Sequence, residues 1–201
     1  MPYTPPPDLA GLSLFEIAEL AAAHKLPPIE SWDPPHSGDS HMRIAADGRW
    51  YHRGSPITRP AMVRLFASIL RREADNGYVL VTPFERQAII VEDAPLLAVE
   101  VKSEGKGQAR DLAFRLNTDE LIIAGSDHPI IIRGTQDHPR PYLLARKGIE
   151  ARIERQLFVE LAELAVAEAE ASAPKTDEAH LGRLGLWSGG TFFALHEAGE
   201  R

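Results

Sequence analysis

Short apolar runs separated by turn-forming residues fill the chain between residues 78 and 146, and this pattern constrains the fold most strongly. The runs are rich in β-branched or aromatic residues, and the segments between them are rich in Gly, Pro, Asp, Asn and Ser. The seven runs are YVLVTP, RQAIIVE, LLAVEVK, ARDLAFRL, ELIIA, PIIIRG and PYLLAR. Their close spacing leaves no room for the crossover helices that parallel strands need. The pattern therefore predicts a C-terminal half built on a seven-strand antiparallel sheet or half-barrel.

Two short helices and a hairpin are predicted before these runs. Residues 13–25 begin with SLFE, which has the spacing of a capping box, and continue with an apolar pattern of helical period. A loop rich in Pro, Gly, Ser and Asp follows at residues 27–41. The Asp47-Gly48 pair is typical of a tight turn between two strands. A second helix is expected from Arg59 or Pro60, because proline is tolerated in the first helical turn, and it is expected to end at the Asn76-Gly77 pair.

A long amphipathic helix is predicted to cap the sheet. It starts at Ile149 and ends near Ala171, and alternating Glu and Arg occupy the face opposite the apolar one. The apolar face consists of Ile149, Ile153, Leu157, Leu161 and Leu164. The last segment, LGLWSGGTFFALHE, is aromatic and glycine-rich and is expected to dock on the body of the protein.

Two pairs of segments hint at an internal duplication. ITRPAMVRLF (57–66) and IEARIERQLF (149–158) share a first Ile and a final Leu-Phe at an offset of 92 residues, and DGRWYHRG (47–54) resembles DHPIIIRG (127–134). The similarity reflects either a repeat or two amphipathic helices that are alike by chance. A repeat predicts two related α+β halves, each with a hairpin followed by a helix.

The predicted division of the chain lies near residue 84. Residues 1–84 would form an N-terminal α+β domain, made of helix, loop, hairpin, helix and strand. Residues 85–201 would form the C-terminal domain with its docking tail. A groove between two such domains is a favoured place for a small ligand.

Composition excludes several functional classes. The 201-residue chain has no cysteine, so disulfides, thiolate metal sites and a cysteine nucleophile are ruled out. No apolar run approaches a membrane span and the first residues lack a signal-peptide pattern, so we expect a cytoplasmic protein. A net charge of −7 argues against general nucleic-acid binding, which depends on phosphate neutralisation.

The charge is unevenly distributed. Residues 43–72 contain seven arginines, no lysine and one acid, a net charge of +6, whereas the remaining residues carry a net charge of −13. Arg64, Arg71 and Arg72 follow a pattern typical of the solvated face of a helix. Other arginines of this stretch belong to the predicted hairpin and helix start, where side chains can converge.

Six ordered motifs resemble the bacterial family called domain of unknown function 1285. They are GDSHMRIAADGRWYHRGSPITR, RLFASILRR, LVTPFE, VEDAP, RPYLLARKGIEARIERQLF and LGLWSGGTFF, and together they cover the chain from about Pro34 to Phe193. The resemblance implies a duplicated two-domain core whose C-terminal part is similar to a pleckstrin-homology fold. It also implies a nucleotide-based ligand at the domain interface and a role in signalling. The family supplies no established catalytic residues.

The candidate ligand site lies in the basic stretch. Arg43, Arg49 and Arg59 would present guanidinium groups on rigid elements, which is what recognition of a phosphate requires. Trp50 can stack on a base, although a tryptophan in a strand is also typical of a core, and His52 lies beside it. The alternative for the arginines is ion pairing with VEDAP and other acids across the interface.

Carboxylates near residue 90 complete the candidate site. Glu85 and the Glu92-Asp93 pair offer oxygens for a divalent ion or a ribose, whereas Asp93 also suits the capping of a turn. PPHSGDSHM brings His36, Asp39 and His41 together, but their spacing matches no established zinc signature, so no metal site is predicted. WSGG, with Ser188, lacks the pattern of a nucleophile elbow.

Three hypotheses follow for function. The first is a non-enzymatic protein that binds a nucleotide-like or phosphate-bearing small molecule between its domains. The second is a protein-interaction module in which the arginine cluster is structural. The third is an enzyme with a dispersed site of His52 or His41 and carboxylates. No cofactor and no catalytic residue is predicted under the first.

Overall fold

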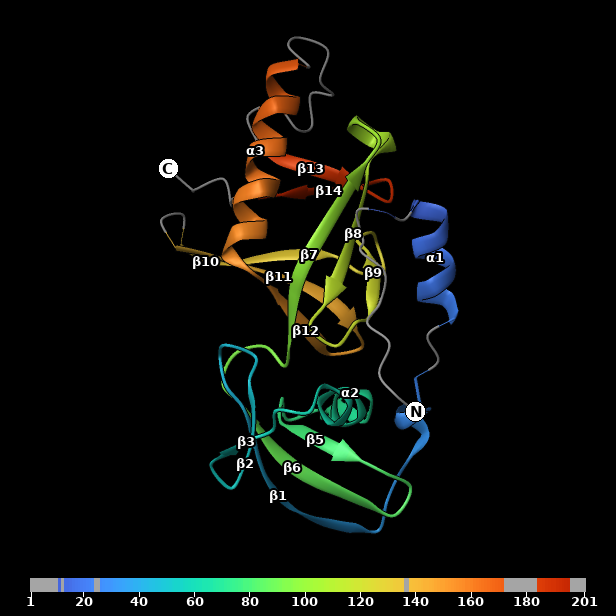
Figure 1. The fold of residues 1–201 in the computed structure, drawn as a ribbon, viewed down its shortest axis with the longest axis vertical. Coiled ribbons are helices and arrows are strands. Elements are labelled where there is room, and N and C mark those ends of the chain that lie inside the picture. The colour runs from blue at the N-terminus through green and yellow to red at the C-terminus, as the bar shows by residue number, and fades with distance from the viewer. Residues whose placement is uncertain (1–10, 12, 24–25, 136–137, 172–183, 196–201) are drawn as a thin grey trace.

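The computed structural model describes residues 11, 13–23, 26–135, 138–171 and 184–195. Two six-stranded sheets, one above the other in Figure 1, form the body of the molecule, and α2 (Pro60–Ser68) lies between them. Each sheet is mixed, because antiparallel strands are joined by one parallel pair. The protein therefore consists of two similar, mostly β halves with added helices.

The first sheet has the strand order β3-β2-β1-β6-β5-β4. Its strands are β1 (His36–Ile44), β2 (Trp50–His52), β3 (Ser55–Pro56), β4 (Leu70–Arg72), β5 (Tyr78–Val81) and β6 (Glu85–Val91). The predicted hairpin is confirmed, because Arg43 pairs with Tyr51 across an antiparallel β1–β2 ladder. Gly48 in its turn has a φ of 79°, which glycine adopts readily. Strands β1 and β6, which are the first and last of these strands along the chain, are neighbours in the sheet and pair in parallel.

The second sheet has the order β10-β11-β12-β7-β8-β9. Its strands are β7 (Leu96–Glu104), β8 (Asp111–Leu116), β9 (Leu121–Ile123), β10 (Ile130–Thr135), β11 (His138–Arg146) and β12 (Ile149–Ile153). When its strands are counted from one to six, both sheets share the order 3-2-1-6-5-4, and the first and last strands pair in parallel in both. The two halves therefore share one topology.

Helices and a hairpin cover the second sheet. Helix α1 (Leu14–Ala23) packs beside β9, and α3 (Arg155–Ala171) packs on β7 and on the hairpin of β13 (Gly185–Ser188) and β14 (Thr191–Ala194). Two one-turn 3₁₀ helices, η2 (Ile29–Ser31) and η3 (Gly107–Ala109), complete the elements. The predicted capping box is confirmed, because Ser13 N–H donates to the Glu16 carboxylate at 2.8 Å and Glu16 N–H donates to Ser13 Oγ at 3.3 Å.

One apolar core runs through both halves. It includes Trp50, Ala67 and Leu70 of the first half and Leu96, Phe114 and other residues of the second. Polar contacts reinforce this junction: Arg64 donates to Asp119 at 2.7 Å, and Arg146 donates to the Ala67 carbonyl. The halves are therefore packed together as one body.

The seven predicted strand runs all form strands, but not one sheet. Two of them, β5 and β6, belong to the first sheet, and the other five belong to the second. The sixth strand of the second sheet, β12, occupies residues that were predicted as the start of the long helix. Ile149, Ala151 and Ile153 are buried at every second position, which is the period of a strand, and α3 begins only at Arg155. The expected seven-strand antiparallel sheet is thus a six-strand mixed sheet.

Other boundaries also differ from the prediction. The expected loop at residues 27–41 contains the first half of β1, because His36–Asp39 pair in parallel with β6, with a bulge before Met42. The first sheet extends past residue 84, because β6 spans Glu85–Val91.

The second predicted helix is also shorter than expected. The chain leaves α2 at Ser68, and Leu70–Arg72 form β4 instead of continuing it.

The two sheets share one topology, but the two sequence segments that suggested a repeat do not form equivalent elements of the two halves. Helix α2 follows the third strand of its half, whereas α3 follows the sixth strand of the other. Segments 57–66 and 149–158 therefore occupy different places in the common order. Their similarity reflects the fact that each segment is amphipathic and contains the start of a helix.

Candidate functional site

The segment that joins the sheets, residues 92–95, carries two consecutive acids. Glu92 is bound by the first half, whereas Asp93 is bound by the second. This connector lies where β6 ends and β7 begins, between the two sheets. Around it we describe the Asp93 cluster, defined as Asp93, Tyr142, Arg152, Arg133, Glu150 and Tyr78.

Glu92 holds the connector to the first half. Its carboxylate forms a short ion pair with Arg43 and accepts a hydrogen bond from Ala46 N–H at 2.9 Å. The Ala46 N–H and the Arg43 guanidinium together hold the pKa of Glu92 below its ordinary value. The Arg43 guanidinium also lies over the Tyr51 ring, 4.4 Å from its centroid. The charge of Arg43 is therefore already balanced within its own half.

Asp93 holds the connector to the second half. The Tyr142 hydroxyl donates to Asp93 Oδ1 at 2.7 Å, and Arg152 Nη1 lies 3.3 Å from Asp93 Oδ2. Burial raises the pKa of Tyr142, and so does its hydrogen bond to Asp93, which favours the neutral phenol. The Asp93 side chain is 18% exposed, so water competes weakly for these contacts.

A second ion pair lies above the Tyr142 ring. Arg133 binds Glu150 through two hydrogen bonds of 2.7 and 2.5 Å, and its guanidinium lies 4.7 Å from the Tyr142 ring centroid. The bonds to Glu150 raise the pKa of Arg133. Burial raises the pKa of Tyr78 on β5, which is close enough to feel the charges of Glu150, Arg133 and Asp93. The cluster therefore spans both halves.

A pocket of about 830 Å³ opens beside this cluster. Its lining residues come from β11, from β12, from Glu154 just after β12 and from the start of α3, so it lies in the second half. Three arginines line it: Arg140, Arg152 and Arg155. Arg152 is shared with the Asp93 cluster. Among the described residues, none forms an ion pair or hydrogen bond with the guanidinium of Arg140 or Arg155.

The rest of the pocket wall is mixed in character. Apolar surface comes from Pro139, Pro141, Ile153, Phe158 and Val159. His138, Gln156 and Glu154 add polar groups. Since α3 begins at Arg155, the N–H groups of its first turn lie at the same place and favour an anion. The pocket thus combines excess positive charge, an apolar wall and one carboxylate that can accept from a hydroxyl or N–H group.

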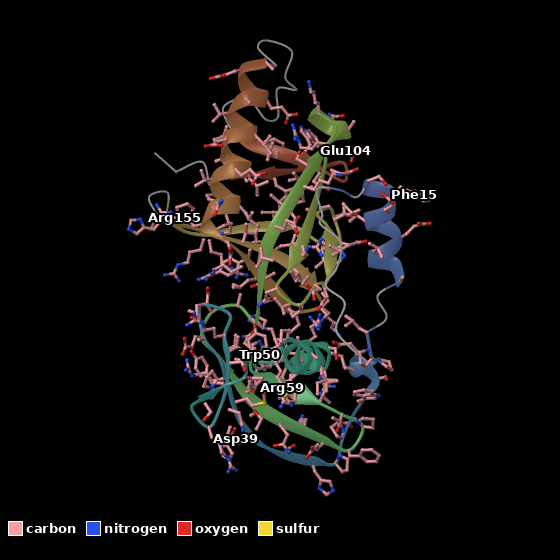
Figure 2. All side chains as sticks on the ribbon, viewed as in Figure 1. Phe15, Asp39, Trp50, Arg59, Glu104 and Arg155 are labelled. Atoms are coloured by element: carbon pink, nitrogen blue, oxygen red, sulfur yellow. The ribbon has the colours of Figure 1, made fainter. Side chains whose placement is uncertain are left out.

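The structure separates this pocket from the predicted arginine site. In Figure 2, Arg155 lies in the upper half at the start of α3, whereas Trp50 and Arg59 lie in the lower half. Arg49 is 75% exposed and lies 3.6 Å from Asp47, its neighbour in the β1–β2 turn. Arg59 is the exposed residue preceding α2, and His52 is exposed at the end of β2. None of these side chains, nor Arg43, lines the pocket beside the Asp93 cluster.

Trp50 and the predicted carboxylates have structural surroundings. Trp50 is 1% exposed and stacks on Phe66, so it takes the core position that was the alternative expectation for this residue. Glu85 is exposed and accepts from Gln87 at 2.8 Å. Asp93, which is one of the predicted residues, forms an ion pair with Arg152, which lines the pocket.

The structure also shows the surroundings of the residues that were considered as metal ligands or as a nucleophile. His41 Nδ1 lies 3.5 Å from Asp39, and among the described residues no group of three histidine or acidic side chains is arranged to hold a metal ion. Ser188 is fully buried, where it donates to the Ala124 carbonyl at 2.7 Å and accepts from Leu112 N–H at 2.8 Å. It therefore fixes the C-terminal hairpin to the second sheet.

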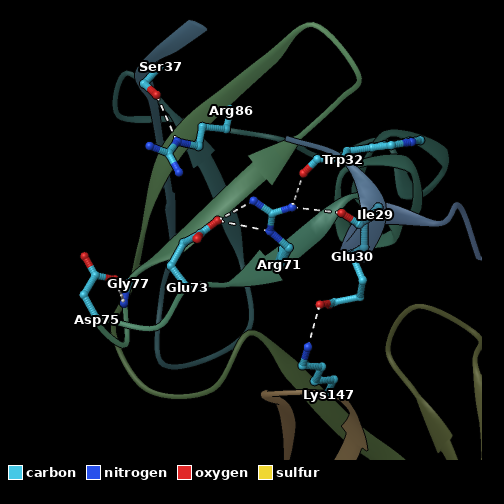
Figure 3. Close-up of polar contacts among 10 residues, drawn as sticks. All are labelled: Ile29, Glu30, Trp32, Ser37, Arg71, Glu73, Asp75, Gly77, Arg86 and Lys147. Atoms are coloured by element: carbon cyan, nitrogen blue, oxygen red, sulfur yellow. Dashed lines mark hydrogen bonds and ion pairs between the residues drawn. The ribbon is translucent and has the colours of Figure 1, made fainter. Parts of the chain in front are cut away.

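Arg64 and Arg71 of the basic stretch hold parts of the fold together. Figure 3 shows Arg71 bound to Glu73 and donating to the carbonyls of Ile29 and Trp32, which ties η2 to β4. Nearby, Lys147 of the second half lies 3.0 Å from Glu30 of the first. Arg64 joins the halves through Asp119, so these arginines are not simply a solvated helix face.

The pocket arginines were missed in the sequence because of the helix assignment. Extending the helix back to Ile149 placed Arg152 and Arg155 on its solvated side. The available signal was the alternation of apolar residues at 149, 151 and 153, which indicates a strand that ends beside a helix start.

The fold and the site define a two-sheet α+β protein with an arginine-lined pocket next to the junction of its halves. The chain belongs to the DUF1285 family: models of its N-terminal and C-terminal domains match residues 27–94 and 95–195. A DUF1285 family protein from Silicibacter pomeroyi DSS-3, known from a crystal structure, has 40% identity and a TM-score of 0.75 over 90% of this chain and 95% of its own.

A second family member has also been solved. The protein from Shewanella baltica OS155 has 27% identity and a TM-score of 0.49 over 61% of this chain and 91% of its own. No curated protein matches the chain. Within the described residues, no helix combines the length and the apolar character required to cross a membrane.

Proposed function

We propose that this protein binds a small anionic molecule in the pocket between β11, β12 and α3. The observation that carries the proposal is that Arg140, Arg152 and Arg155 line one pocket, two of them without a partner among the described residues. Guanidinium groups with unused donors are suited to phosphate and carboxylate groups, which they bind through two parallel hydrogen bonds.

The pocket wall narrows the class of ligand. Pro139, Pro141 and Phe158 offer apolar surface, which inorganic phosphate alone would leave uncovered. The Glu154 carboxylate repels a second anion but accepts from a hydroxyl or ring N–H group. A phosphate-bearing molecule with a sugar or heterocycle fits this combination, and this agrees with the nucleotide-based ligand and signalling role that the family resemblance implies.

The proposed site differs in place from the one expected between the domains. The ligand would lie in the second half and reach the junction through Arg152, which also contacts Asp93. The pleckstrin-homology likeness, the cytoplasmic location and the absence of catalysis remain predictions under this proposal.

A thermal-shift screen tests the proposal. The panel contains inorganic phosphate, pyrophosphate, nucleoside mono- and diphosphates, cyclic dinucleotides and sugar phosphates. A ligand at a hundred times its dissociation constant stabilises the folded state by about 2.7 kcal/mol, which raises Tm by roughly 5 to 10 °C for a chain of this size. The Arg140→Gln, Arg155→Gln double variant should lose that shift.

The matched control removes two arginines elsewhere. Arg49→Gln, Arg53→Gln makes the same change in charge on exposed positions of the first half and should keep the shift. A shift that survives in the pocket variant but disappears in the control would contradict the proposal. A flat response across the panel would also contradict it and would favour the protein-interaction hypothesis.

A further inference from the structure

Arg152 is the one residue that belongs to both the pocket and the Asp93 cluster. It lines the pocket beside Arg140 and Arg155, and its Nη1 lies 3.3 Å from Asp93 Oδ2. Its side chain is 32% exposed, so it can be reached by a ligand. The negative charge of the connector therefore acts directly on a group that would bind an anion.

We propose that Asp93 competes with the pocket ligand for Arg152, so that Asp93 sets the affinity for anions and couples pocket occupancy to the connector between the halves. This inference rests on the proposed function. When the pocket is empty, Asp93 balances the charge of Arg152. When an anion enters, the Arg152 guanidinium donates hydrogen bonds to the ligand instead of to Asp93. Asp93 then keeps the Tyr142 hydroxyl as its remaining partner.

The geometry of the pair makes this exchange possible. The Arg152 to Asp93 contact is a single hydrogen bond of 3.3 Å, whereas Arg133 and Glu150 share two bonds of 2.7 and 2.5 Å. Arginine has five N–H donors, so Arg152 has donors left for a second partner. Of the two ion pairs, the single-bonded pair of Arg152 and Asp93 is therefore the one that a ligand can replace.

Exchange of Asp93 for a ligand at Arg152 also affects the connector between the two halves. Asp93 follows Glu92, which is held by Arg43 and Ala46 of the first half. The two neighbouring acids thus attach one short segment to both halves. Because coupling between two binding events is reciprocal, a ligand that weakens the Arg152 contact of Asp93 must itself bind more tightly when that contact is removed.

Calorimetric titration with inorganic pyrophosphate tests the inference. Asp93→Asn removes the competing charge but keeps an oxygen that can accept from Tyr142. We expect this variant to bind pyrophosphate at least fivefold more tightly than the wild type. Glu92→Gln removes a charge from the adjacent residue, whose carboxylate is bound by Arg43 and Ala46 of the first half. The affinity of this variant should stay within about twofold of the wild type.

The outcomes separate the two proposals. Equal affinities in Asp93→Asn and Glu92→Gln, with binding intact, would overturn the competition and leave the pocket function standing. If pyrophosphate and the other panel members bind neither the wild type nor the variants, the proposed function itself is overturned.

Hydrogen exchange of the wild-type protein provides a measurement that needs no substitution. With saturating pyrophosphate, amides at the start of α3 should exchange more slowly. The amides of Asp93, Ala94, Leu96 and Leu97 should exchange faster, because the contact between Asp93 and Arg152 weakens. Protection at α3 without any change in the connector would overturn the coupling, even if Asp93→Asn did not fold.

Discussion

At the scale of single residues, Trp50 shows how burial decides function. The indole lies in the core of the first half, with ring centroids 6.3 Å apart where it stacks on Phe66. Its Nε1–H is buried, and no described residue accepts from it. A buried donor without a partner carries a desolvation cost, so the stabilising part of this side chain is its apolar area.

Two substitutions separate packing from ligand contact at this position. Trp50→Ala should destabilise the protein by about 3 to 5 kcal/mol, because it leaves a cavity. Trp50→Phe should cost much less, because it keeps the stacking and removes the unpaired N–H, and it should leave anion binding unchanged. Urea unfolding measures the stability of the two variants, and calorimetry measures their anion binding. Loss of binding in a folded Trp50→Phe variant would show that the indole contacts the ligand after all.

The arginines show the limit of counting charge. The net charge of +6 over residues 43–72 is real, but Arg43, Arg64 and Arg71 each have an acidic partner in the folded chain. Those partners lie up to 55 residues away, so a local charge count does not detect them. What matters for an anion is a guanidinium without a partner in a pocket, and this depends on tertiary contacts.

At the scale of elements, α3 is tied to the second sheet near its C-terminal end. Glu168 accepts from Arg110 at 2.8 Å and from Gly107 N–H of η3 at 2.5 Å. Burial alone would raise the pKa of Glu168, but its bonds to Arg110 and Gly107 outweigh burial and lower the pKa below its ordinary value. The ionised carboxylate is therefore the form that the fold stabilises.

This contact predicts a dependence on pH. Since the folded-state pKa of Glu168 is lowered, its contribution to stability is present above the unfolded pKa and is lost as the pH falls through the folded pKa. Glu168→Gln should cost roughly 2 kcal/mol at pH 7, and the difference from the wild type should shrink in acid. Glu163→Gln, at an exposed position of the same helix, should have little effect.

Denaturant unfolding at several pH values measures the difference. A Glu168→Gln penalty that stays constant down to pH 3 would contradict the assigned ion pair.

Elements were predictable where one local signal dominated. The Asp47-Gly48 turn, the Ser13 and Glu16 capping box and the seven strand runs each follow from a few neighbouring residues, and each is present. The start of α3 was misplaced because Ile149, Ile153 and Leu157 fit a helical face, while Ile149, Ala151 and Ile153 equally fit a strand. Pairing of β12 with β11 and β7 resolves this choice, and it is a long-range property.

At the scale of the whole molecule, two sheets of one topology meet across α2 and the connector. The sequence predicted two related halves, but the allocation of strands depended on pairings such as β1 with β6, whose partners are 49 residues apart at His36 and Glu85. The pocket could not be located until β12 and the start of α3 were placed. Its residues are close in sequence, but their convergence requires the turn from strand to helix at Glu154.

The central claim is that an anion binds at Arg140, Arg152 and Arg155. Crystals soaked in tungstate test it most directly, because this oxyanion resembles phosphate in shape and charge and scatters anomalously. We predict an anomalous peak in the pocket, with tungstate oxygens at about 2.7 to 3.2 Å from these guanidinium groups. A peak at Arg49, Arg53 and Arg59 in the first half, with the pocket empty, would contradict the account.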